Sequence, residues 1–255
     1  MSGRQRHAPW RAGGRYHPRT VEQWNEPEDK EAVRAFRQAH PALAQTIRGV
    51  REQHLTYLPG RALRDLASVI MEADEHGLPG SLIEAGCALG GSAIVMSAAR
   101  RPGRNMVVYD AFGMIPPPGP DDGPDAHARY EVIVSGASGG VGGDTYYGYR
   151  SDLQSEVRCN LAAFGQQDVQ LVPGFFADSL QPTGPVSIAH IDADWYDSVM
   201  TCFERIAPVL SVGGRFVLDD YDQWSGCRGA TDEFLAGTPA FRAERRIRLH
   251  LVKVS

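Results

Sequence analysis

The sequence predicts an α/β fold built on a mostly parallel sheet, and two observations carry this prediction. Short apolar runs of strand length alternate with stretches whose apolar residues recur at helical spacing. Two of the apolar runs end in acidic residues: His-Ile-Asp-Ala-Asp at 190–194 and Phe-Val-Leu-Asp-Asp-Tyr at 216–221. Continuous apolar runs are typical of strands buried in a parallel sheet, which present functional residues at their carboxyl ends.

The first clear element is a helix over residues 61–74. Its apolar residues follow the stripe of an amphipathic helix and are Leu63, Leu66, Ala67, Ile70 and Met71. The sequence Gly-Leu-Pro-Gly at 77–80 ends this helix, because glycine favours a helix C-terminus and proline cannot continue a helix. Residues 21–50, which precede it, predict further helical pieces.

A β-α-β unit follows this helix. Residues 81–85 predict a strand, residues 92–100 a helix, and residues 106–109 a second strand that ends in Asp110. A glycine-rich turn joins the first of these strands to the helix.

Residues 113–149 interrupt the alternation of strands and helices. This segment holds three consecutive prolines at 116–118 and glycine pairs at 139–140 and 142–143. A long irregular segment inside a domain is usually a functional lid or is disordered. We therefore predict an insertion that closes over a ligand.

The alternation resumes after the insertion and continues to the C-terminus. The expected elements are helices at 151–164 and 198–210, and strands at 169–172, 187–191, 215–218 (introduced by Gly213 and Gly214) and 245–254. Apolar and charged residues partly alternate in the last strand, which is typical of a half-exposed antiparallel strand. We predict an N-terminal arm with helices at 1–50 and one main domain at 51–255.

Composition and charge narrow the possible functions. With 42% hydrophobic and 22% charged residues, the chain has the composition of a soluble globular protein. Its net charge of -5 argues against a nucleic-acid-binding surface. Its apolar runs are shorter than the ~18 residues that predict a membrane span. The four cysteines show no CxxC spacing, so we expect reduced, buried thiols in a cytoplasmic protein.

The first 20 residues carry five arginines and no acidic residue. They lack the apolar core of a secretory signal, and their glycines and prolines interrupt the amphipathic helix of a transit peptide. We expect a mobile or partner-wrapping arm, with a basic nucleic-acid-binding tail as the alternative.

The glycine turn of the β-α-β unit predicts a nucleotide-like cofactor site. It reads Glu-Ala-Gly-Cys-Ala-Leu-Gly-Gly-Ser at 84–92, a GxxxGG spacing that differs from the GxGxxG of dinucleotide-binding turns. With Asp110 after the next strand, this pattern favours S-adenosylmethionine, whose ribose hydroxyls would donate to the Asp110 carboxylate. Glu84 either anchors the turn or meets the amino-acid part of the cofactor. A turn that only links a strand to a helix is the structural alternative.

The two acidic motifs predict a metal site. The carboxyl ends of strands in an open α/β sheet can meet in one crevice. Carboxylates at close quarters repel one another unless a positive group lies between them, and hard divalent cations prefer oxygen ligands. The sequence therefore favours a metal-assisted reaction. Taken alone, Asp219 and Asp220 are equally compatible with a turn or a helix cap.

Together these segments resemble the macrocin O-methyltransferase family, the metal-dependent sugar methyltransferases of antibiotic pathways. The resemblance covers roughly residues 56–235, and the matching stretches lie at 80–86, 90–91, 172–180, 190–198, 210–214, 219–221, 226–228 and 232–234. The paired acidic motifs are its most specific part. The chain departs from the family pattern in Cys-Ala-Leu at 87–89, in the long insertion and in the N-terminal arm, which leaves the acceptor open.

The resemblance implies a class I methyltransferase fold that uses S-adenosylmethionine and Mg²⁺ to methylate a hydroxyl group, expected to be on the sugar of a glycosylated natural product. It places metal ligands at Asp192, Asp219 and Asp220 and a candidate general base at Asp194, so that Asp192 and Asp194 are the expected catalytic residues. The expected cofactor-binding residues are Glu84, Gly86, Ser92, Asp110, Ala111, Phe112, Gly174 and Asp192. The arm and the family both favour a homo-oligomer.

The side chain of Asp194 would lie on the same side as that of Asp192 if the extended strand continued through both residues. It could then take a proton from a hydroxyl that the metal has acidified. The alternative role for Asp194 is to orient a metal ligand. His190 would point to the opposite side of the strand, so we expect it to be a satisfied core histidine.

Several aromatic residues are candidates for the acceptor pocket. Phe112, Trp195 and Tyr196 are expected at its wall, and Tyr146, Tyr147 and Tyr149 are expected to close over it. Two other functions stay open: methyl transfer to an amine, phenol or carboxylate, and a non-catalytic S-adenosylmethionine-binding partner of another biosynthetic protein. The retained acids argue against the second, because a scaffold has no need of a metal.

Overall fold

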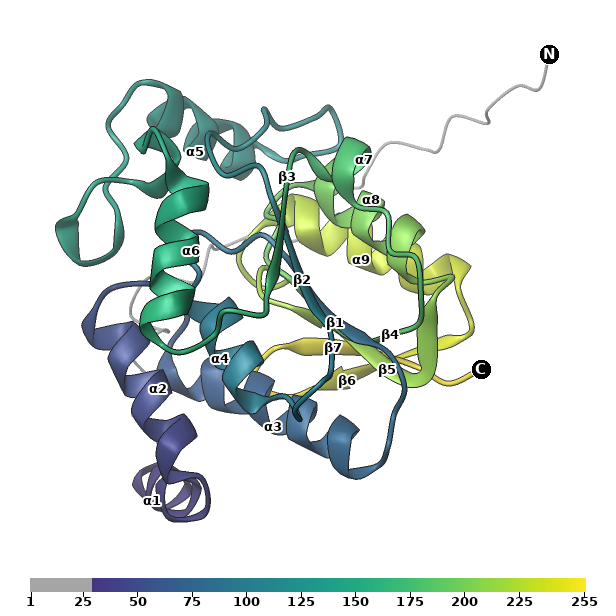
Figure 1. Cartoon of the computed structure of the whole chain (residues 1–255). Coiled ribbons are helices and arrows are strands. Elements are labelled where there is room, and N and C mark those ends of the chain that lie inside the picture. The colour runs from purple at the N-terminus through teal and green to yellow at the C-terminus, as the bar shows by residue number, and fades with distance from the viewer. Residues whose placement is uncertain (1–28) are drawn as a thin grey trace.

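One sheet of seven strands organises the computed structural model, which describes residues 29–255 (Figure 1). The strands lie in the order β3-β2-β1-β4-β5-β7-β6, and β7 runs antiparallel to both of its neighbours. Their bounds are Ser81–Ala85 (β1), Met106–Asp110 (β2), Gln170–Pro173 (β3), Val186–Ile191 (β4), Leu210–Leu218 (β5), Phe241–Arg245 (β6) and Leu249–Lys253 (β7). The predicted α/β fold with a mostly parallel sheet is confirmed, whereas the arginine-rich segment 1–20 lies outside the described residues.

Helices cover both faces of the sheet and make a three-layer structure. The larger helices are Lys30–Ala39 (α1), Pro41–Glu52 (α2), Gly60–Glu75 (α3), Gly91–Ala99 (α4), Pro124–Val134 (α5), Leu153–Ala163 (α6), Tyr196–Ile206 (α8) and Ser225–Gly237 (α9), with one short helix at Phe176–Ser179 (α7). Helices α2, α3, α4 and α6 enclose one apolar core, and α8 and α9 enclose the other. Figure 1 shows these two groups of helices on opposite sides of the strands.

The register of the parallel strands places the ends of β1, β4 and β5 at one edge of the sheet. Ala85 lies beside Ile191, and Ile191 lies beside Leu218. The amide of Asp192 donates to the carbonyl of Ala85 at 2.9 Å, and that of Asp219 donates to Ile191 at 3.0 Å. The two acidic motifs therefore leave the sheet next to each other, as the sequence predicts.

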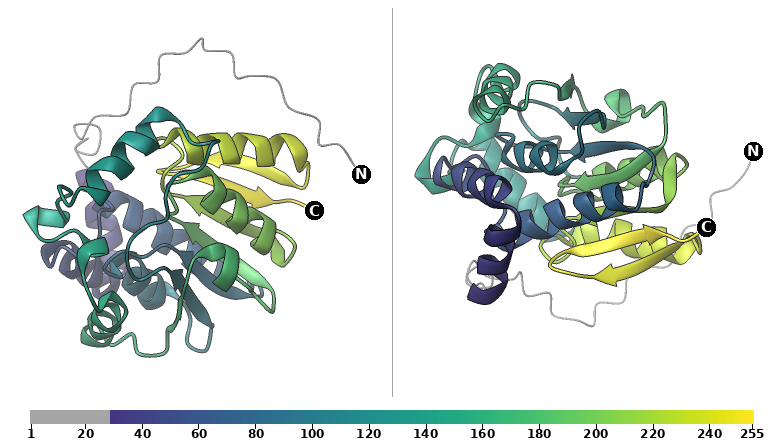
Figure 2. Two further views of the ribbon diagram at one scale, coloured as in Figure 1. Left: turned by 90° about the horizontal axis from the view of Figure 1, so that it is seen from above. Right: turned by 60° about the horizontal axis from the view of Figure 1, so that its bottom comes forward.

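The C-terminal part of the sheet differs from the prediction. Strand β7 is not half-exposed, because Leu249, His250, Leu251 and Val252 are all buried. It lies between β5 and β6 within the sheet, and the hairpin that it forms with β6 makes up the edge of the sheet (Figure 2). The sequence analysis missed both β6 and α9. Strand β5 also runs through Gly213 and Gly214 instead of starting after them.

The insertion at 113–149 has structure of its own. It contains α5 and two short 3₁₀ turns at Val141–Gly143 and Tyr147–Tyr149. Ala126, Ile133 and Tyr146 are buried within it. A closing motion of this segment stays a prediction.

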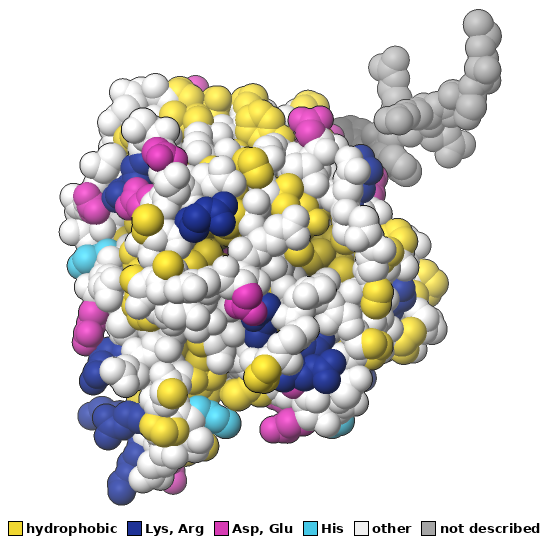
Figure 3. All heavy atoms as spheres, viewed as in Figure 1, with side chains coloured by type: hydrophobic (Ala, Val, Ile, Leu, Met, Phe, Trp, Pro, Cys, Tyr) yellow, Lys and Arg dark blue, Asp and Glu magenta, His cyan; other side chains and the backbone are white. Residues whose placement is uncertain are grey.

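The remaining expectations concern the surface and the thiols. Cys87, Cys202 and Cys227 are buried free thiols, as predicted, whereas Cys159 is exposed, because it lies on the outer face of α6. On the face drawn in Figure 3, basic and acidic side chains are interspersed. No helix in the described part of the chain is long and apolar enough to cross a membrane.

A substitution at Gly86 tests how closely the ends of β1 and β4 approach each other. It has φ +87°, and a Cβ there would lie 1.9 Å from the carbonyl oxygen of Asp192. We expect Gly86→Ala to lower the free energy of unfolding by roughly 3–5 kcal/mol, from backbone strain and overpacking together. Gly103 is the matched control, because it has φ +81° with nothing within 4 Å of a new Cβ. Gly103→Ala should cost only about 1–2 kcal/mol, and equal losses in urea titrations would contradict the close approach.

Candidate active site

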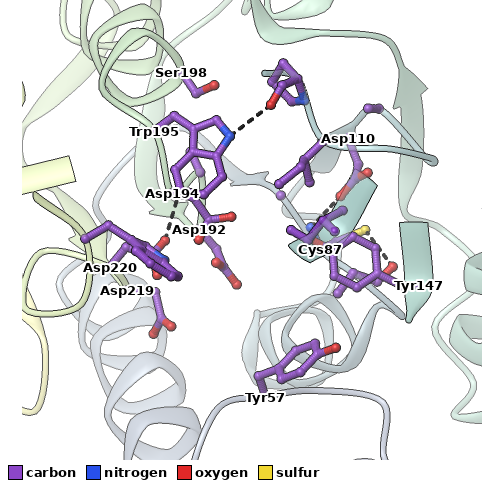
Figure 4. Close-up of a pocket in the computed structure, with 18 of the residues that line it drawn as sticks. Tyr57, Cys87, Asp110, Tyr147, Asp192, Asp194, Trp195, Ser198, Asp219 and Asp220 are labelled. Carbon is purple, nitrogen blue, oxygen red and sulfur yellow. Dashed lines mark hydrogen bonds between the residues drawn. The ribbon is translucent and has the colours of Figure 1, made fainter. Parts of the chain in front are cut away.

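A cavity of about 1190 Å³ opens at the carboxyl edge of the sheet (Figure 4). Ligand pockets commonly measure about 300–1,000 Å³, so this cavity has room for two small molecules side by side. Figure 4 shows Asp192, Asp194 and Asp220 on one side, and Asp110 and Cys87 on the other. The cavity therefore has two chemically different walls.

The first wall is the glycine turn between β1 and α4. The carboxylate of Asp110 accepts hydrogen bonds from the amides of Cys87 and Phe112, both at 2.7 Å. The amide of Gly86 donates to the carbonyl of Tyr109 at 2.9 Å. Burial raises the pKa of Asp110, and the two amide hydrogen bonds act in the opposite direction. Asp110 thus holds the turn in place while it faces the cavity.

The residues predicted to bind the cofactor divide into two groups. Five of them line the cavity: Gly86, Asp110, Ala111, Gly174 and Asp192. The other three lie behind its wall. Glu84 and Ser92 are buried, and Phe112 packs against the helical core.

Glu84 and His190 form a buried pair on neighbouring strands. Glu84 lies beside His190 in the β1–β4 register, and its Oε1 is 3.3 Å from Nδ1 of the histidine. Burial lowers the pKa of His190, but the hydrogen bond and charge of Glu84 outweigh it, so the pKa is raised. His190 is therefore a core residue as expected, and Glu84 anchors the strand beneath the turn.

The second wall carries the acidic motifs. Asp192, Asp194 and Asp220 each offer an oxygen, and these three oxygens lie within 4.8 Å of one another. The sequence analysis placed Asp194 beside Asp192 on the condition that the extended strand continued through both residues. This condition is not met, because β4 ends at Ile191 and Asp194 has the left-handed φ of 54°. Its amide donates to Oδ2 of Asp220 at 3.2 Å. A turn, and not strand alternation, brings Asp194 to Asp192.

Burial and mutual repulsion raise the pKa values of these acids. The pKa of Asp192 is well above its usual range through burial, then through the charges of Asp219 and Asp194. Burial, and then the charges of Asp194, Asp192 and Asp219, raise the pKa of Asp220 well above its usual range. Burial raises the pKa of Asp194 to about 6, while Trp224 and Arg129 act in the opposite direction. Asp194 is therefore mostly ionised at neutral pH, and the group as a whole favours a bound cation.

Asp219 has a different partner from the other three acids. Arg248 donates to both of its oxygens, at 2.7 and 3.3 Å. Arg248 follows the turn of the β6–β7 hairpin, directly before Leu249, which pairs with the last residue of β5. The sequence analysis did not find this arginine, because its closeness to Asp219 depends on an antiparallel pairing that no local pattern reveals.

Three tyrosines and Arg129 also contribute to the lining of the cavity. Tyr57, Tyr146 and Tyr147 line it, with ring centroids 6.3 Å apart for Tyr57 and Tyr147 and 4.4 Å apart for Tyr146 and Tyr147. Arg129 of α5 also lines it. Tyr57 and Arg129 were missed, because neither lies in a motif.

The other predicted aromatic residues have separate places. Trp195 lines the cavity, and its indole donates to the carbonyl of Pro116 at 2.9 Å. The hydroxyl of Tyr196 donates to Glu233 at 2.6 Å, and that of Tyr149 donates to the carbonyl of Ile133 at 2.5 Å. These two rings stabilise neighbouring helices and the insertion.

The family model of macrocin O-methyltransferases matches residues 14–254 of this sequence. The chain belongs to this family. It is similar to the 8-demethyl-8-(2,3-dimethoxy-alpha-L-rhamnosyl)-tetracenomycin-C 4'-O-methyltransferase of Streptomyces olivaceus, with 31% identity over 76% of this chain and 69% of that protein. It is 28% identical to the demethyldecarbamoylnovobiocin O-methyltransferase of Streptomyces niveus, over 81% of this chain and 74% of the relative. This macrocin O-methyltransferase family member is an enzyme that transfers methyl groups to oxygen.

Solved structures share the fold of this family member. The O-methyltransferase NovP superposes with a TM-score of 0.67 at 23% identity and covers 81% of this chain and 88% of its own. The calicheamicin methyltransferase CalS11 superposes with a TM-score of 0.59 at 16% identity and covers 99% of both chains. The class I methyltransferase architecture is thus confirmed.

The pair of Arg248 and Asp219 should contribute strongly to stability. Only 14% of the arginine side chain and 7% of the aspartate side chain are exposed. Arg248→Met leaves a buried carboxylate without this partner, so we expect the free energy of unfolding to fall by about 3–5 kcal/mol. Arg245→Met is the control, because Arg245 pairs with Asp222 while half-exposed, and should cost at most about 1 kcal/mol. Urea denaturation measures both, and equal losses would mean that the buried pair has no special weight.

Proposed function

We propose that this enzyme moves a methyl group from S-adenosylmethionine to a hydroxyl group of a glycosylated natural product, with Mg²⁺ held by the acidic motifs. One observation carries the proposal: a single cavity has the Asp110-bound glycine turn on one wall and the carboxylate cluster on the other. A donor cofactor on the first wall and a metal-bound acceptor on the second would face each other across it.

The cofactor wall supports S-adenosylmethionine. Each oxygen of Asp110 accepts one backbone amide, which leaves acceptor capacity for the two ribose hydroxyls. Gly86, Ala111 and Gly174 extend the same wall. The buried Glu84 would act from below the turn and not by contact.

The acidic wall fits a hard divalent cation. Three carboxylates within 4.8 Å of one another, with pKa values raised by burial, offer oxygen donors whose repulsion a cation would relieve. Asp192 and Asp220 would hold the ion together with Asp219, as in the family pattern, or with Asp194, which lies nearer to them. When bound, Mg²⁺ would lower the pKa of the acceptor hydroxyl and orient it.

Asp194 is the proposed general base. Its pKa of about 6 leaves it ionised at neutral pH and yet basic enough to accept a proton. The turn after β4 directs it into the cavity beside Asp192 (Figure 4).

The acceptor side suits a sugar. Tyr57, Tyr146 and Tyr147 offer flat ring surfaces and hydroxyl groups to the cavity. The relatives named above act on a rhamnosyl tetracenomycin and on a novobiocin precursor. Phenol, amine or carboxylate acceptors are the alternatives, and a non-catalytic role is disfavoured by the retained carboxylates.

Isotope transfer tests the proposed function. The enzyme is incubated with S-adenosylmethionine carrying a labelled methyl group and a panel of glycosides, phenols, amines and carboxylic acids, with Mg²⁺ or with EDTA. We expect label in a glycoside only when Mg²⁺ is present. Transfer that survives EDTA would reject the metal, and label only in phenols, amines or acids would reject the sugar acceptor.

Binding of Mg²⁺ should depend on pH through the acidic cluster. The folded pKa values of Asp192, Asp194 and Asp220 are raised, so their charge costs stability at neutral pH, and this cost disappears as pH falls through those values. Mg²⁺ at 100 times its Kd stabilises by about 2.7 kcal/mol. We expect Mg²⁺ to raise the Tm of the protein several degrees at pH 7.5 and much less at pH 5.5, where protons compete for the same oxygens.

Asp220→Asn is the control for this measurement. It removes one carboxylate but leaves His190, whose raised pKa also makes the folded state more stable at lower pH. The variant should lose most of the Mg²⁺ response while it keeps the contribution of His190. An equal Tm shift in the wild type and the variant would contradict the proposed site.

Asp194→Asn separates a base from a metal ligand. Asparagine keeps the size of the side chain and loses its basicity, so turnover should fall about 10²–10⁴-fold. If Asp194 is the base, calorimetry should show unchanged Mg²⁺ and S-adenosylhomocysteine affinities. A loss of Mg²⁺ affinity would assign it to the metal, and turnover close to that of the wild type would remove it from the reaction.

A further inference from the structure

Helix α8 begins just after the first acidic motif and α9 begins after the short loop that follows the second, and the N-cap side chain of neither helix caps it. The N-cap residue of α8 is Trp195 and that of α9 is Trp224, and neither makes a side-chain cap hydrogen bond. The first amides of a helix need acceptors, which a nearby Ser, Thr, Asp or Asn usually supplies. In this chain the acceptors come from elsewhere.

Two aspartates of the insertion supply the missing acceptors. Oδ1 of Asp122 accepts the amide of Tyr196, the first residue of α8, at 2.8 Å. Oδ2 of Asp125 accepts the amide of Ser225, the first residue of α9, at 2.9 Å, and its other oxygen accepts the hydroxyl of Ser225. These partners are 74 and 100 positions apart in the sequence. A carboxylate at a helix N-terminus also gains from the helix dipole.

The contacts around these caps leave no spare room. A Cβ on Gly226 would lie 1.9 Å from Oδ1 of Asp122, and a Cβ on Gly119 would lie 2.5 Å from Oδ2 of Asp197. The amide of Gly119 donates to the second oxygen of Asp122 at 2.9 Å. Asp122 is only 9% exposed. The insertion and the starts of both helices therefore meet without intervening space.

A third contact joins the same surfaces. The indole of Trp195 donates to the carbonyl of Pro116, as drawn in Figure 4, and its ring packs edge-on against Trp224 with centroids 5.5 Å apart. The residues that precede the two helices thus contact each other as well as the insertion. Three separate links connect the insertion to the acidic loops.

We propose that Asp122 and Asp125 are positioning residues of the active site. They hold the turn after β4, which carries Asp192 and Asp194, and the turn after β5, which carries Asp220, against the insertion that carries Tyr146 and Tyr147. Segment 116–125 and the turns that carry the carboxylates then form one linked unit, so a loosening of this segment also loosens the acidic cluster. Segment 116–125 is the fixed end of the predicted lid, and closure belongs to the residues that follow it.

Hydrogen exchange tests the link without any ligand. In Asp122→Ala and Asp125→Ala, two sets of peptides should exchange faster together: those from 113–134 and those that contain the start of α8 or α9. We expect their exchange rates to be roughly 3- to 30-fold higher than in the wild type, because the free energy of one helix cap changes the opening equilibrium by this factor. Asp125→Asn should exchange more slowly than Asp125→Ala, because the amide oxygen of asparagine can still accept the backbone amide of Ser225, although its nitrogen cannot accept the Ser225 hydroxyl. Asp121→Ala is the matched control on an exposed neighbour. Faster exchange confined to residues 116–125 would overturn the proposal.

Binding measurements test the positioning role. Mn²⁺ alone, followed by its electron paramagnetic resonance signal, should bind about 10-fold more weakly to Asp122→Ala, because a supporting contact of the proposed ligand loop is lost. S-adenosylhomocysteine should bind as to the wild type, since the glycine turn lies on the other wall. If Asp122→Ala exchanges faster but binds Mn²⁺ as tightly as the wild type, the aspartates cap the helices without positioning the carboxylates, and the proposal is wrong. The Mn²⁺ measurement rests on the proposed metal site. If the wild type binds no Mn²⁺, the metal site is rejected, and the hydrogen-exchange experiment still tests whether the two aspartates join the insertion to α8 and α9.

Discussion

Parallel pairing among β1, β4 and β5 continues for one residue past the strand ends. The amides of Asp192 and Asp219 still donate to the neighbouring strands before the chain turns away. This pairing decides which side chains share the cavity, because a shift of register would carry each acidic motif away from the other. Gly86 belongs to the same constraint, since the carbonyl of Asp192 occupies the space of a β-carbon. These hydrogen bonds therefore set the distance between the glycine turn and the carboxylates.

The architecture that gathers four carboxylates must also offset their repulsion. Arg248 neutralises Asp219, whereas the other three acids are left with raised pKa values. Backbone strain collects around the same cavity: the described non-glycine residues with positive φ are His54, Ala88, Phe112 and Asp194. Three of the four line the cavity, and Phe112 packs against the helical core behind its wall. Strain of this kind persists where the surrounding structure holds it in place, which is common at functional sites.

The insertion is bound to the elements that carry the carboxylates and is not only a cover. The tyrosines with which it lines the cavity lie on the same segment as the aspartates that cap α8 and α9. Hydrogen bonds therefore join this part of the cavity lining to the turns that carry the carboxylates.

The alternation of apolar runs and helical stripes was enough to predict the α/β fold, the position of β1 to β5 and the meeting of the two acidic motifs, because strand burial and strand direction are local consequences of the sequence. Other features arose only in the tertiary structure. The backbone turn at Asp194, the pairing of Arg248 with Asp219, the burial of β7 and the entry of Tyr57 into the cavity depend on contacts between distant segments. The caps from Asp122 and Asp125 are the clearest case, since a local pattern cannot reveal an acceptor 74 or 100 residues away. Functional residues that directly follow a strand can be predicted from the local sequence pattern. Charge compensation and helix capping between distant segments depend on how these segments pack.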